Sequence, residues 1–420
     1  MVATSLPHVV IVGGGFGGLY AARALAHRPV RVTLLDRRNH HLFQPLLYQV
    51  ATAVLNPSDI AVPLRSVLRR ATNITVLLAE VQKVELANRR LVLDRGEIGY
   101  DAVVLAAGAS HSYFGHDEWE VLAPGLKTLE DALEIRRRVL LAYEAAEREQ
   151  DGAERQALLT FVVIGGGPTG VELAGALGEI SRQTVARDFR LIDPTKSRIV
   201  LLEGGSLILP TFPESLSRGA ADALRRIGVE VRVGAIVTRV TPDAVWLGGE
   251  QIRARTVLWA AGVAASPLAR TLGVTLDRSG RVPVEPDLSI AGHPEAFVIG
   301  DMSVLRGPSG SPFPGLAPVA IQQGQRAADN VLRRLSGQPT RTFHYRDRGS
   351  MATIGRAAAV AVVGRIQLSG LVAWLAWLLV HVMFLIGFRN RFLVLFEWAW
   401  AYVSWQRGAR LITGPWRGRD

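Results

Sequence analysis

Cysteine is absent from this 420-residue chain. Its absence excludes disulfide bonds, thiolate metal ligands, iron–sulfur clusters and every reaction that depends on a redox-active thiol. The nine histidines do not replace cysteine as metal ligands, because no two of them are four residues apart with an acid between them. His40 and His41 are adjacent, so they would point to opposite faces of a strand. We therefore predict no metal site.

A secretory leader and a nucleic-acid-binding surface are missing as well. An apolar run at residues 9–12 leaves no room for a leader, so we expect the body of the protein to stay in the cytoplasm. The net charge of +11 is uneven: from Arg346 onward there are ten arginines and three acidic residues, with six of the nine tryptophans. Because these arginines alternate with apolar runs, the tail favours an anionic lipid surface and disfavours nucleic acid as partner.

The first three hundred residues contain an internal repeat. "HVVIVGGGFGGLYAARAL" (8–25) and "FVVIGGGPTGVELAGAL" (161–177) each predict a buried strand, a G-x-G-x-x-G turn and a helix. The first glycine permits the bend, the second lets the backbone approach a pyrophosphate, and the third lets the helix pack on the strand. The predicted nucleotide-binding residues are Gly13, Gly14, Gly15, Phe16, Gly17 and Gly18 in the first copy, and Gly165, Gly166, Gly167, Pro168, Thr169 and Gly170 in the second.

An acidic residue ends the second strand of each copy. A carboxylate in this place binds the ribose of adenosine and repels a 2′-phosphate. Asp36 lies 23 residues after Gly13, as expected, whereas Glu203 lies 38 residues after Gly165, because roughly residues 181–197 look inserted. For Glu203, a surface glutamate after a strand is the alternative.

Later strands extend the repeat. "YDAVVLAAGAS" (100–110) matches "TVLWAAGVAAS" (256–266), so two dinucleotide folds, each with its own nucleotide, are expected. A third buried strand, "PEAFVIGDMS" (294–303), ends in Asp301, at the edge where open α/β sheets bind ligands. A plain Gly-Asp turn is the alternative for Asp301.

Together these motifs resemble the two-dinucleotide-domain flavoproteins of the pyridine-nucleotide reductase superfamily. The resemblance spans residues 7–335 and implies that the first fold binds FAD and the second binds NADH. We accordingly expect an α/β protein with two Rossmann-like dinucleotide-binding domains. The expected parts are an FAD domain at 1–118 and 285–340, which is split by an NADH domain at 119–284, and a C-terminal membrane-anchoring helical region at 341–420.

Three longer stretches narrow the resemblance. "RRNHHLFQPLLYQVATAVLNPSDIAVPLR" (37–65), "GLAPVAIQQGQRAADN" (315–330) and the tail from "MATIGRAAAVA" (351–361) to "QRGARLITG" (406–414) are similar to type II NADH:quinone oxidoreductases. This implies that non-covalently bound FAD passes two electrons from NADH to a membrane quinone without proton pumping. A membrane-bound NADH-responsive redox sensor and an NADH-dependent reductase of a ferredoxin-like acceptor are the alternatives.

The resemblance also implies further cofactor contacts. For FAD these are Arg37, His41, Val81, Ala107, Gly108 and Ala320, in addition to Asp36 and Asp301; for NADH, Gly262 joins Glu203. A plain loop histidine is the alternative for His41.

Glu172 is the catalytic residue that the resemblance implies. Its carboxylate would lie beside the flavin, where it would orient nicotinamide or serve the protonation of quinone. The alternative is a glutamate that is merely favoured by the helix dipole.

Expected quinone contacts are Ala317, Pro318, Ala320, Gln322 and Ile354. Pro318 departs from the family's A-Q-x-A-x-Q motif, because it replaces the first glutamine and removes a backbone donor. Gln322 has an exposed helical glutamine as its alternative, and Gln323 is expected to project elsewhere.

The tail begins with an apolar run, "LVAWLAWLLVHVMFLIGF" (371–388). As a helix its 18 residues extend roughly 27 Å, just short of the ~30 Å hydrocarbon core. Trp374, Trp377 and His381 lie inside this run. A second run, "FLVLFEWAWAYVSW" (392–405), carries Glu397, and its Trp398 and Trp405 share a helix face.

These features favour two helices that lie in the membrane surface over a true span or a buried dimer or domain core. Arg389, Arg391, Arg407 and Arg410 would lie near anionic headgroups. We expect a homodimer that is attached peripherally to the cytoplasmic face of the cell membrane through these C-terminal helices.

Overall fold

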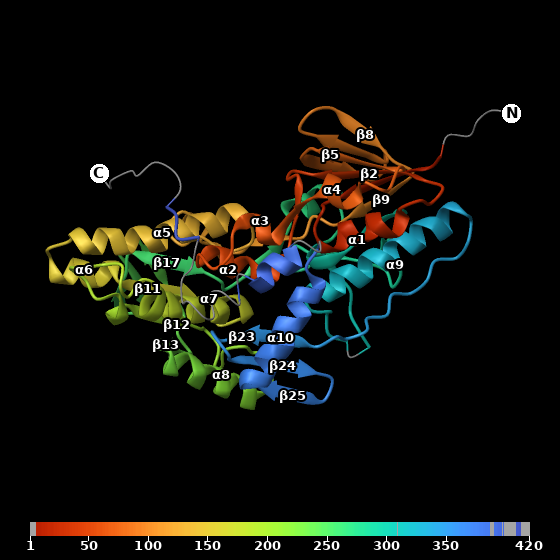
Figure 1. The fold of residues 1–420 in the computed structure, drawn as a ribbon. Coiled ribbons are helices and arrows are strands. Elements are labelled where there is room, and N and C mark those ends of the chain that lie inside the picture. Colours follow the sequence, from red (N-terminus) through yellow and green to blue (C-terminus); the bar gives the residue numbers. More distant parts are fainter. Residues whose placement is uncertain (1–5, 309, 387–389, 397, 399–408, 413–420) are drawn as a thin grey trace. The chain divides into compact units, whose positions relative to one another are not determined.

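The computed structural model describes residues 6–308, 310–386, 390–396, 398 and 409–412. Contacts divide the chain into two compact units, which Figure 1 draws in sequence colours. Unit 1 comprises Met1–Leu42, Ala61–His111 and Val263–Asp347, and unit 2 comprises Phe43–Ile60, Ser112–Gly262 and Arg348–Asp420. Each unit contains a parallel sheet, which confirms the α/β class. The predicted FAD, NADH and anchoring parts are defined by what each would bind, whereas these two units are defined by contacts between residues. The bounds of the three parts therefore stay a prediction.

Unit 1 is built on a six-stranded sheet in the order β20-β21-β9-β1-β2-β5. Its strands are β1 (His8–Val12), β2 (Arg31–Asp36), β5 (Ile74–Leu78), β9 (Ala102–Leu105), β20 (Ser289–Ile290) and β21 (His293–Val298). All neighbouring pairs are parallel except β20 and β21. Strands β1 and β9 are buried along their whole length, as uninterrupted apolar runs predict for strands whose two faces are both covered.

Helix α1 (Phe16–Leu25) follows β1 and packs against α9 (Ala317–Leu335), beside which it lies in Figure 1. The helices approach closely because both have glycine at the contact: a Cβ on Gly324 would lie 2.2 Å from the carbonyl oxygen of Gly17. The other elements of unit 1 are β3 (His40–Leu42), β4 (Ala61–Pro63), α4 (Leu64–Leu68), β6 (Val81–Glu85), β7 (Arg90–Leu93), β8 (Glu97–Gly99), β10 (Ala109–His111), β18 (Val263–Ala265), β19 (Val282–Pro283) and β22 (Ser303–Val304).

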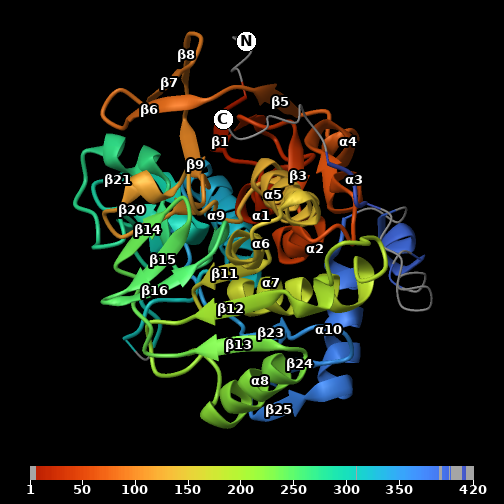
Figure 2. The same ribbon diagram turned by 90° about the vertical axis from the view of Figure 1, so that its left-hand side faces the viewer.

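Unit 2 contains a four-stranded parallel sheet in the order β13-β12-β11-β17. Its strands are β11 (Thr160–Ile164), β12 (Arg198–Leu202), β13 (Val229–Arg232) and β17 (Thr256–Trp259). Figure 2 shows α7 (Pro168–Glu179) and α8 (Glu214–Arg226) against this sheet. The remaining elements outside the tail are α2 (Leu47–Ala51), α3 (Pro57–Ile60), α5 (Leu129–Arg148), α6 (Gly152–Leu158), β14 (Arg239–Thr241), β15 (Ala244–Leu247) and β16 (Glu250–Arg253).

The inserted residues of unit 2 continue α7 and then turn back towards β12. They form a π-helical turn at Ile180–Thr184 and a 3-10 turn at Pro194–Lys196. Glu147 of α5 fixes the loop between these turns, because its carboxylate accepts the N–H groups of Arg190 and Ile192. The insertion is therefore an ordered addition to the frame.

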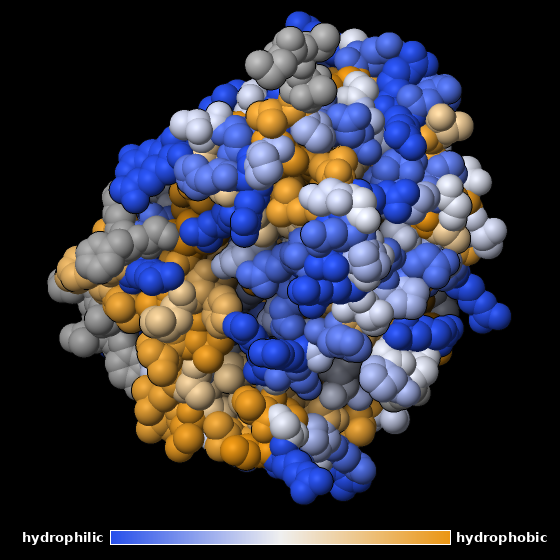
Figure 3. Space-filling model, turned by 90° about the vertical axis from the view of Figure 1, so that its right-hand side faces the viewer, coloured by the Kyte–Doolittle hydropathy of each residue, from blue (hydrophilic) through white to orange (hydrophobic). Residues whose placement is uncertain are grey.

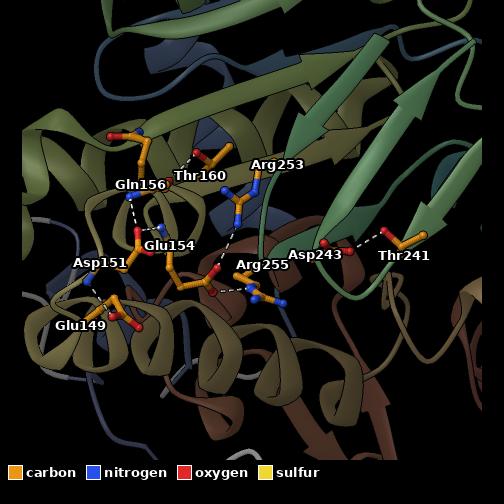
Figure 4. Close-up of polar contacts among 10 residues, drawn as sticks. Glu149, Asp151, Glu154, Gln156, Thr160, Thr241, Asp243, Arg253 and Arg255 are labelled. Carbon is orange, nitrogen blue, oxygen red and sulfur yellow. Dashed lines mark hydrogen bonds and ion pairs between the residues drawn. The ribbon is translucent and has the colours of Figure 1, made fainter. Parts of the chain in front are cut away.

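Ion pairs attach α6 to the strands that lead to β17. The carboxylate of Glu154 contacts Arg255 and, at 3.2 Å, Arg253 (Figure 4). Asp151 caps the helix by accepting the N–H groups of Ala153 and Glu154. None of these residues is a predicted ligand contact, so this cluster belongs to the frame of unit 2.

The tail forms part of unit 2. Strands β23 (Ser350–Thr353), β24 (Ala359–Val363) and β25 (Ile366–Ser369) make an antiparallel sheet, and α10 (Gly370–Phe384) follows. Strand β23 packs on α7, and α10 packs on β24. The helix expected over residues 371–388 ends earlier than expected, at Phe384. Its 15 residues extend roughly 22 Å.

The described ranges contain no helix that combines the length and the apolar character needed to cross a membrane. Arg389, Glu397, Trp405 and Arg407, which the sequence analysis singled out, lie outside the described residues.

Candidate active site

The turn after β1 has the geometry that a bound phosphate requires. Gly13 has a φ of +101°, and a Cβ on it would lie 2.4 Å from the carbonyl oxygen of Ala106. A Cβ on Gly18 would lie 1.8 Å from the carbonyl oxygen of Gly13, so both positions exclude side chains. A Cβ on Gly15, in contrast, would meet no described atom within 4 Å. This open space at the N-terminus of α1 fits the pyrophosphate of FAD.

Asp36 fixes the conformation of this turn. Its Oδ2 accepts the N–H of Gly14 at 2.6 Å, and its Oδ1 accepts the N–H of Arg38 at 2.7 Å. Because a carboxylate oxygen can accept more than one hydrogen bond, these contacts leave Asp36 able to accept from a ribose hydroxyl.

The turn after β11 repeats these contacts in unit 2. Gly165 has a φ of +109°, and a Cβ on Gly167 would again meet no described atom within 4 Å. Glu203 accepts the N–H of Gly166 and that of Gly205, each at 2.6 Å. The insertion before β12 has therefore not displaced the acid. Glu203 occupies the same place as Asp36, which disfavours the plain surface glutamate.

His41 lies directly beside the first turn and is 2% exposed. Its Nδ1 lies 3.0 Å from the carbonyl oxygen of Gly14, and its ring meets that of Phe16 edge-on at 5.0 Å between centroids. Burial lowers the pKa of the imidazole and keeps the ring neutral. With Nδ1 donating to the carbonyl, Nε2 is an acceptor, and it has no partner in the described part of the chain. A buried acceptor without a donor fits a site that a dinucleotide completes.

The Gly-Asp turn after β21 is held by a residue that the sequence analysis did not assign to the site. Gln323 of α9 is 2% exposed, and its Oε1 accepts the N–H of Gly300 at 2.6 Å. This hydrogen bond fixes the turn in which Asp301 lies. The only sequence signal for this role was the position of Gln323 on the buried face of α9, which it shares with Ala327 and Asn330.

The other predicted FAD contacts of unit 1 lie in varied surroundings. Ala107 and Gly108 follow β9 and are half-buried, as is Val81 at the start of β6. Ala320 is half-buried too. Arg37 is exposed, with its guanidinium 3.9 Å from Glu80.

The predicted quinone residues of unit 1 lie in the first turns of α9. Ala317 begins the helix and Pro318 follows it, where the missing N–H costs no helical hydrogen bond. The side chain of Gln322 is already engaged: its Nε2 donates to the carbonyl of Arg346 at 3.0 Å, and its Oε1 accepts the N–H of Arg346 at 2.9 Å. Gln322 and Gln323 project in different directions, as predicted.

Gly262, the further NADH contact predicted, lies against an aromatic side chain in unit 2. A Cβ on Gly262 would lie 2.6 Å from the ring of Phe114. Phe114 is 68% exposed and has a φ of +54°, which is rare for a bulky residue. This conformation could not be predicted, because phenylalanine has no preference for a positive φ.

Glu172 lies in the first turns of α7 and lines a cavity of about 90 Å³ within unit 2. Burial raises the pKa of its carboxyl to about 8, and the N–H of Thr353 lies 3.5 Å from Oε1. At neutral pH the group is therefore mostly protonated, whereas a helix dipole alone would keep it ionised. The other lining residues are Tyr48, Gln49, Val54, Ala176, Glu179, Gln183, Thr184, Thr353, Gly355, Arg356, Trp374, Trp377 and Trp398.

A row of hydrogen bonds runs along one wall of this cavity. Nε1 of Trp398 donates to Oε1 of Gln49 at 2.7 Å, and Nε2 of Gln49 donates to the hydroxyl of Tyr48 at 3.0 Å. The Tyr48 hydroxyl lies 3.0 Å from Oγ1 of Thr353. None of these residues was predicted as a site residue, and their one sequence signal was a Tyr-Gln pair inside an apolar run.

The tail contributes the tryptophans of the cavity wall. Trp377 is 2% exposed, and its indole Nε1 is buried without a partner among the described residues. Ile354, the predicted quinone residue of unit 2, is 3% exposed and packs against Gly175 of α7. Because Trp374 and Trp377 both line the cavity, they help to form the interior of unit 2.

Comparison with known proteins covers both units and the tail. Residues 7–324 match the family described as pyridine nucleotide-disulphide oxidoreductase, and residues 348–404 match the NDH2 C-terminal domain. The structure of NDH2 from Plasmodium falciparum in complex with NADH has a TM-score of 0.88 at 19% identity, with 97% of this chain and 100% of that chain covered. This likeness shows the fold.

Two curated relatives extend the match to the level of sequence. Type II NADH:quinone oxidoreductase NdhA of Mycobacterium tuberculosis is 45% identical over 424 residues, which cover 96% of this chain and 89% of that protein. Type II NADH:quinone oxidoreductase of Staphylococcus aureus is 30% identical over 367 residues, which cover 84% and 89%. The chain therefore belongs to the type II NADH:quinone oxidoreductase family.

Proposed function

We propose that the protein transfers two electrons from NADH, through bound FAD, to a quinone. FAD supplies the redox chemistry, because it accepts two electrons from one substrate and passes them to the other. Besides the family, the observation that carries the proposal is the repeated glycine turn: Asp36 and Glu203 hold two equivalent dinucleotide-binding turns, one in each unit.

In unit 1 we assign FAD to the turn at Gly15. Its pyrophosphate would meet the N–H groups at the start of α1, and Asp36 would accept a hydrogen bond from ribose. The acceptor Nε2 of His41 would meet a donor of the cofactor, and Gln323 would keep Asp301 in place. The FAD contacts assigned to Arg37, Val81, Ala107, Gly108 and Ala320 rest on the resemblance alone.

In unit 2 we assign NADH to the turn at Gly167. Glu203 would bind the ribose of its adenosine and repel the 2′-phosphate of NADPH, because like charges would meet. The NADH contact assigned to Gly262 rests on the resemblance, because a Cβ at this position would lie 2.6 Å from the ring of Phe114, which already occupies the space.

For the quinone we propose that Glu172 is the proton donor. Reduction to quinol needs two protons, and a carboxyl with a pKa of about 8 holds one at neutral pH. The indole N–H of Trp377, which has no partner among the described residues, offers a hydrogen bond to a carbonyl oxygen. The quinone contacts assigned to Ala317, Pro318, Ala320, Gln322 and Ile354 rest on the resemblance.

We propose that α10 attaches the protein peripherally to the cytoplasmic face of a membrane with anionic lipids. Its outer face is apolar, and Figure 3 shows this face as a continuous hydrophobic area. Such an area on a protein surface marks a membrane or protein contact. The exposed apolar residues of α10 are Leu371, Val372, Leu375, Leu379 and Met383, and Phe392, Leu395 and Phe396 are exposed further along the tail.

Two of the arginines expected at headgroups make contacts within the protein instead. Arg391 donates to the carbonyls of Leu385 and Met383 at the end of α10, and Arg410 pairs with Asp188. The support that the described residues give to lipid binding is therefore apolar, and the preference for anionic lipids rests on the basic composition of the tail. The homodimer stays a prediction, which light scattering on the purified protein checks.

Stopped-flow spectroscopy of the purified protein with NADH and then quinone tests the electron transfer. We expect NADH to bleach the flavin absorbance and quinone to restore it at the rate of turnover. A flavin that NADH reduces but quinone leaves reduced would contradict the proposal, and so would slow recovery without turnover, which is the behaviour of a redox sensor.

A further inference from the structure

The hydrogen bonds from Trp398 to Tyr48 have a fixed direction. An indole N–H can only donate, so the atom of Gln49 that faces Trp398 must be its oxygen. The amide nitrogen of Gln49 then donates to Tyr48, whose own hydrogen can in turn be donated to Oγ1 of Thr353, 3.0 Å away. With Tyr48 as the donor, the hydroxyl hydrogen of Thr353 points away from Tyr48.

Thr353 is also the residue whose backbone N–H lies 3.5 Å from Oε1 of Glu172. The row therefore ends beside the carboxyl that the proposed function uses as proton donor. Hydrogen bonds in such a row polarise one another, so donation by Tyr48 makes the Thr353 hydroxyl a stronger donor. We propose that Tyr48 is a positioning residue for Glu172, and that Trp398 and Gln49 orient Tyr48 for this role.

Burial supports this assignment. Tyr48 is 8% exposed and Gln49 is 7% exposed, so water does not replace their hydrogen bonds without a structural change. Burial and the nearby Glu172 raise the pKa of Tyr48, which keeps the phenol protonated. Tyr48 thus presents a neutral phenol, rather than a phenolate, on its side of the cavity.

Other titratable groups also line the cavity. Glu179 comes from the end of α7 and accepts the N–H of Arg356, which lies between β23 and β24. Helix α10 contributes Trp374 and Trp377, which do not titrate, and His381 stacks on Trp377 with its pKa lowered by burial to about 4. The groups near Glu172 that could move its titration are therefore Tyr48, Glu179 and Arg356.

The inference rests on the proposed function, and the test separates the two. Tyr48→Phe keeps the ring and removes the hydroxyl. We expect kcat for quinone reduction to fall about tenfold, with KM for quinone nearly unchanged, because the donor is misplaced rather than the substrate. Without the Tyr48 hydroxyl, Thr353 is a weaker donor beside the carboxylate, so the ionised form of Glu172 is less stabilised and the pH at which activity declines should move upward by about half a unit.

The matched control is Tyr143→Phe. Tyr143 is a buried tyrosine of unit 2 whose hydroxyl contacts Ser197 and lies outside the cavity lining. It should leave kcat and the pH profile unchanged. Stopped-flow reduction of the flavin by NADH should proceed in both variants at the rate of the wild type. If NADH does not reduce the flavin of the wild-type protein itself, that result refutes the proposed function and not the role of Tyr48.

Trp398→Phe decides the matter if Tyr48→Phe does not fold. It keeps an aromatic ring next to Trp377 and removes the N–H that orients Gln49. We expect a shift of the pH profile in the same direction and of smaller size. The inference would be overturned if a folded Tyr48→Phe protein had the kcat and pH profile of the wild type. If only Trp398→Phe folds, the same result in that variant would overturn it.

Discussion

Glu203 and Gly166 are joined by a hydrogen bond of 2.6 Å, from the glycine N–H to Oε2 of the carboxylate. Asp36 and Gly14 make the same contact in unit 1, also at 2.6 Å. Each acid therefore holds a glycine turn, and we propose that each also binds a ribose hydroxyl.

We expect Glu203→Gln to weaken NADH binding and to reduce the preference for NADH over NADPH. The amide cannot accept both N–H groups that the carboxylate accepts, and it no longer repels a 2′-phosphate. Steady-state kinetics with both nucleotides measure the effect, about tenfold in KM for NADH. Asp36→Asn is the matched control in the other turn: it should lower FAD retention, whereas Glu203→Gln should purify with full FAD. Equal loss of FAD in both variants would contradict the assignment of the two turns.

The glycines of the second turn should respond differently to alanine. Gly167 has an ordinary φ of −70° and open space at its Cβ position, so Gly167→Ala should fold normally, retain FAD and raise KM for NADH about tenfold. Gly165→Ala should fail to fold, because the Cβ would lie 2.5 Å from Ala260 and Ala261. Unchanged NADH kinetics in a folded Gly167→Ala protein would place the dinucleotide elsewhere.

Glu172 gives a pH-dependent contribution to stability. Its carboxyl titrates near 4.5 in the unfolded chain and at about 8 in the folded protein. Between these values the folded state binds more protons, so this residue lowers stability as the pH rises from 4.5 to 8, and the full penalty is present above 8. Glu172→Gln should therefore match the wild type near pH 4.5 and be more stable at pH 9, by up to about 5 kcal/mol. Urea unfolding at the two pH values measures this difference.

The same variant should also lose quinone reduction, by about a hundredfold, because an amide donates no proton to the quinone. Reduction of the flavin by NADH should persist. A variant that is no more stable than wild type at pH 9 would show that the carboxyl is ionised in the cavity.

Arg136 is a buried cation whose observed hydrogen bonds all go to carbonyl oxygens. It is 5% exposed and donates to Val50, Leu55 and Ala409. Arg136→Leu would leave these three acceptors unsatisfied, so we expect a loss of about 3 kcal/mol in the free energy of unfolding. Arg137→Leu changes the neighbouring arginine, which pairs with Glu134 on the half-exposed side of α5, and should cost less than about 1 kcal/mol. Similar losses in the two variants, measured by urea unfolding, would argue against the buried contacts.

Lipid binding should depend on the outer face of α10. Replacing Leu375 and Leu379 together by glutamate introduces two charges on exposed positions, which should release the protein from sedimenting anionic vesicles without lowering its melting temperature. Leu191→Glu is the control, because Leu191 is equally apolar and 72% exposed but lies outside this face. Undiminished sedimentation of the double variant would assign lipid binding to another surface.

Much of this architecture could be predicted from local sequence. The two glycine turns were predictable because Gly13 and Gly165 need conformations that other residues rarely adopt. Asp36 was predictable from its distance along the chain from Gly13. Glu203 was uncertain, because spacing alone does not show that the residues inserted before β12 leave the position of the acid unchanged. The helix of the tail was predicted, but its end at Phe384 was not.

The residues that were missed act through distant partners. Gln49 and Trp398 are 349 positions apart, and Gln323 reaches Gly300 across 23 positions between two elements. No periodicity or motif encodes such pairs. Trp374 and Trp377 show the same limit, because an apolar residue in an apolar helix suits a lipid surface and a protein interior equally well.

The two glycine turns, the absence of thiol chemistry and the family could be predicted from local sequence, because they depend on which residues are present and on the conformations that neighbouring residues permit. The folded structure was needed to show which polar groups meet and why the pKa of Glu172 is raised. Hydrogen-bond partners and the desolvation that raises a pKa arise from residues that the fold brings together from remote parts of the chain.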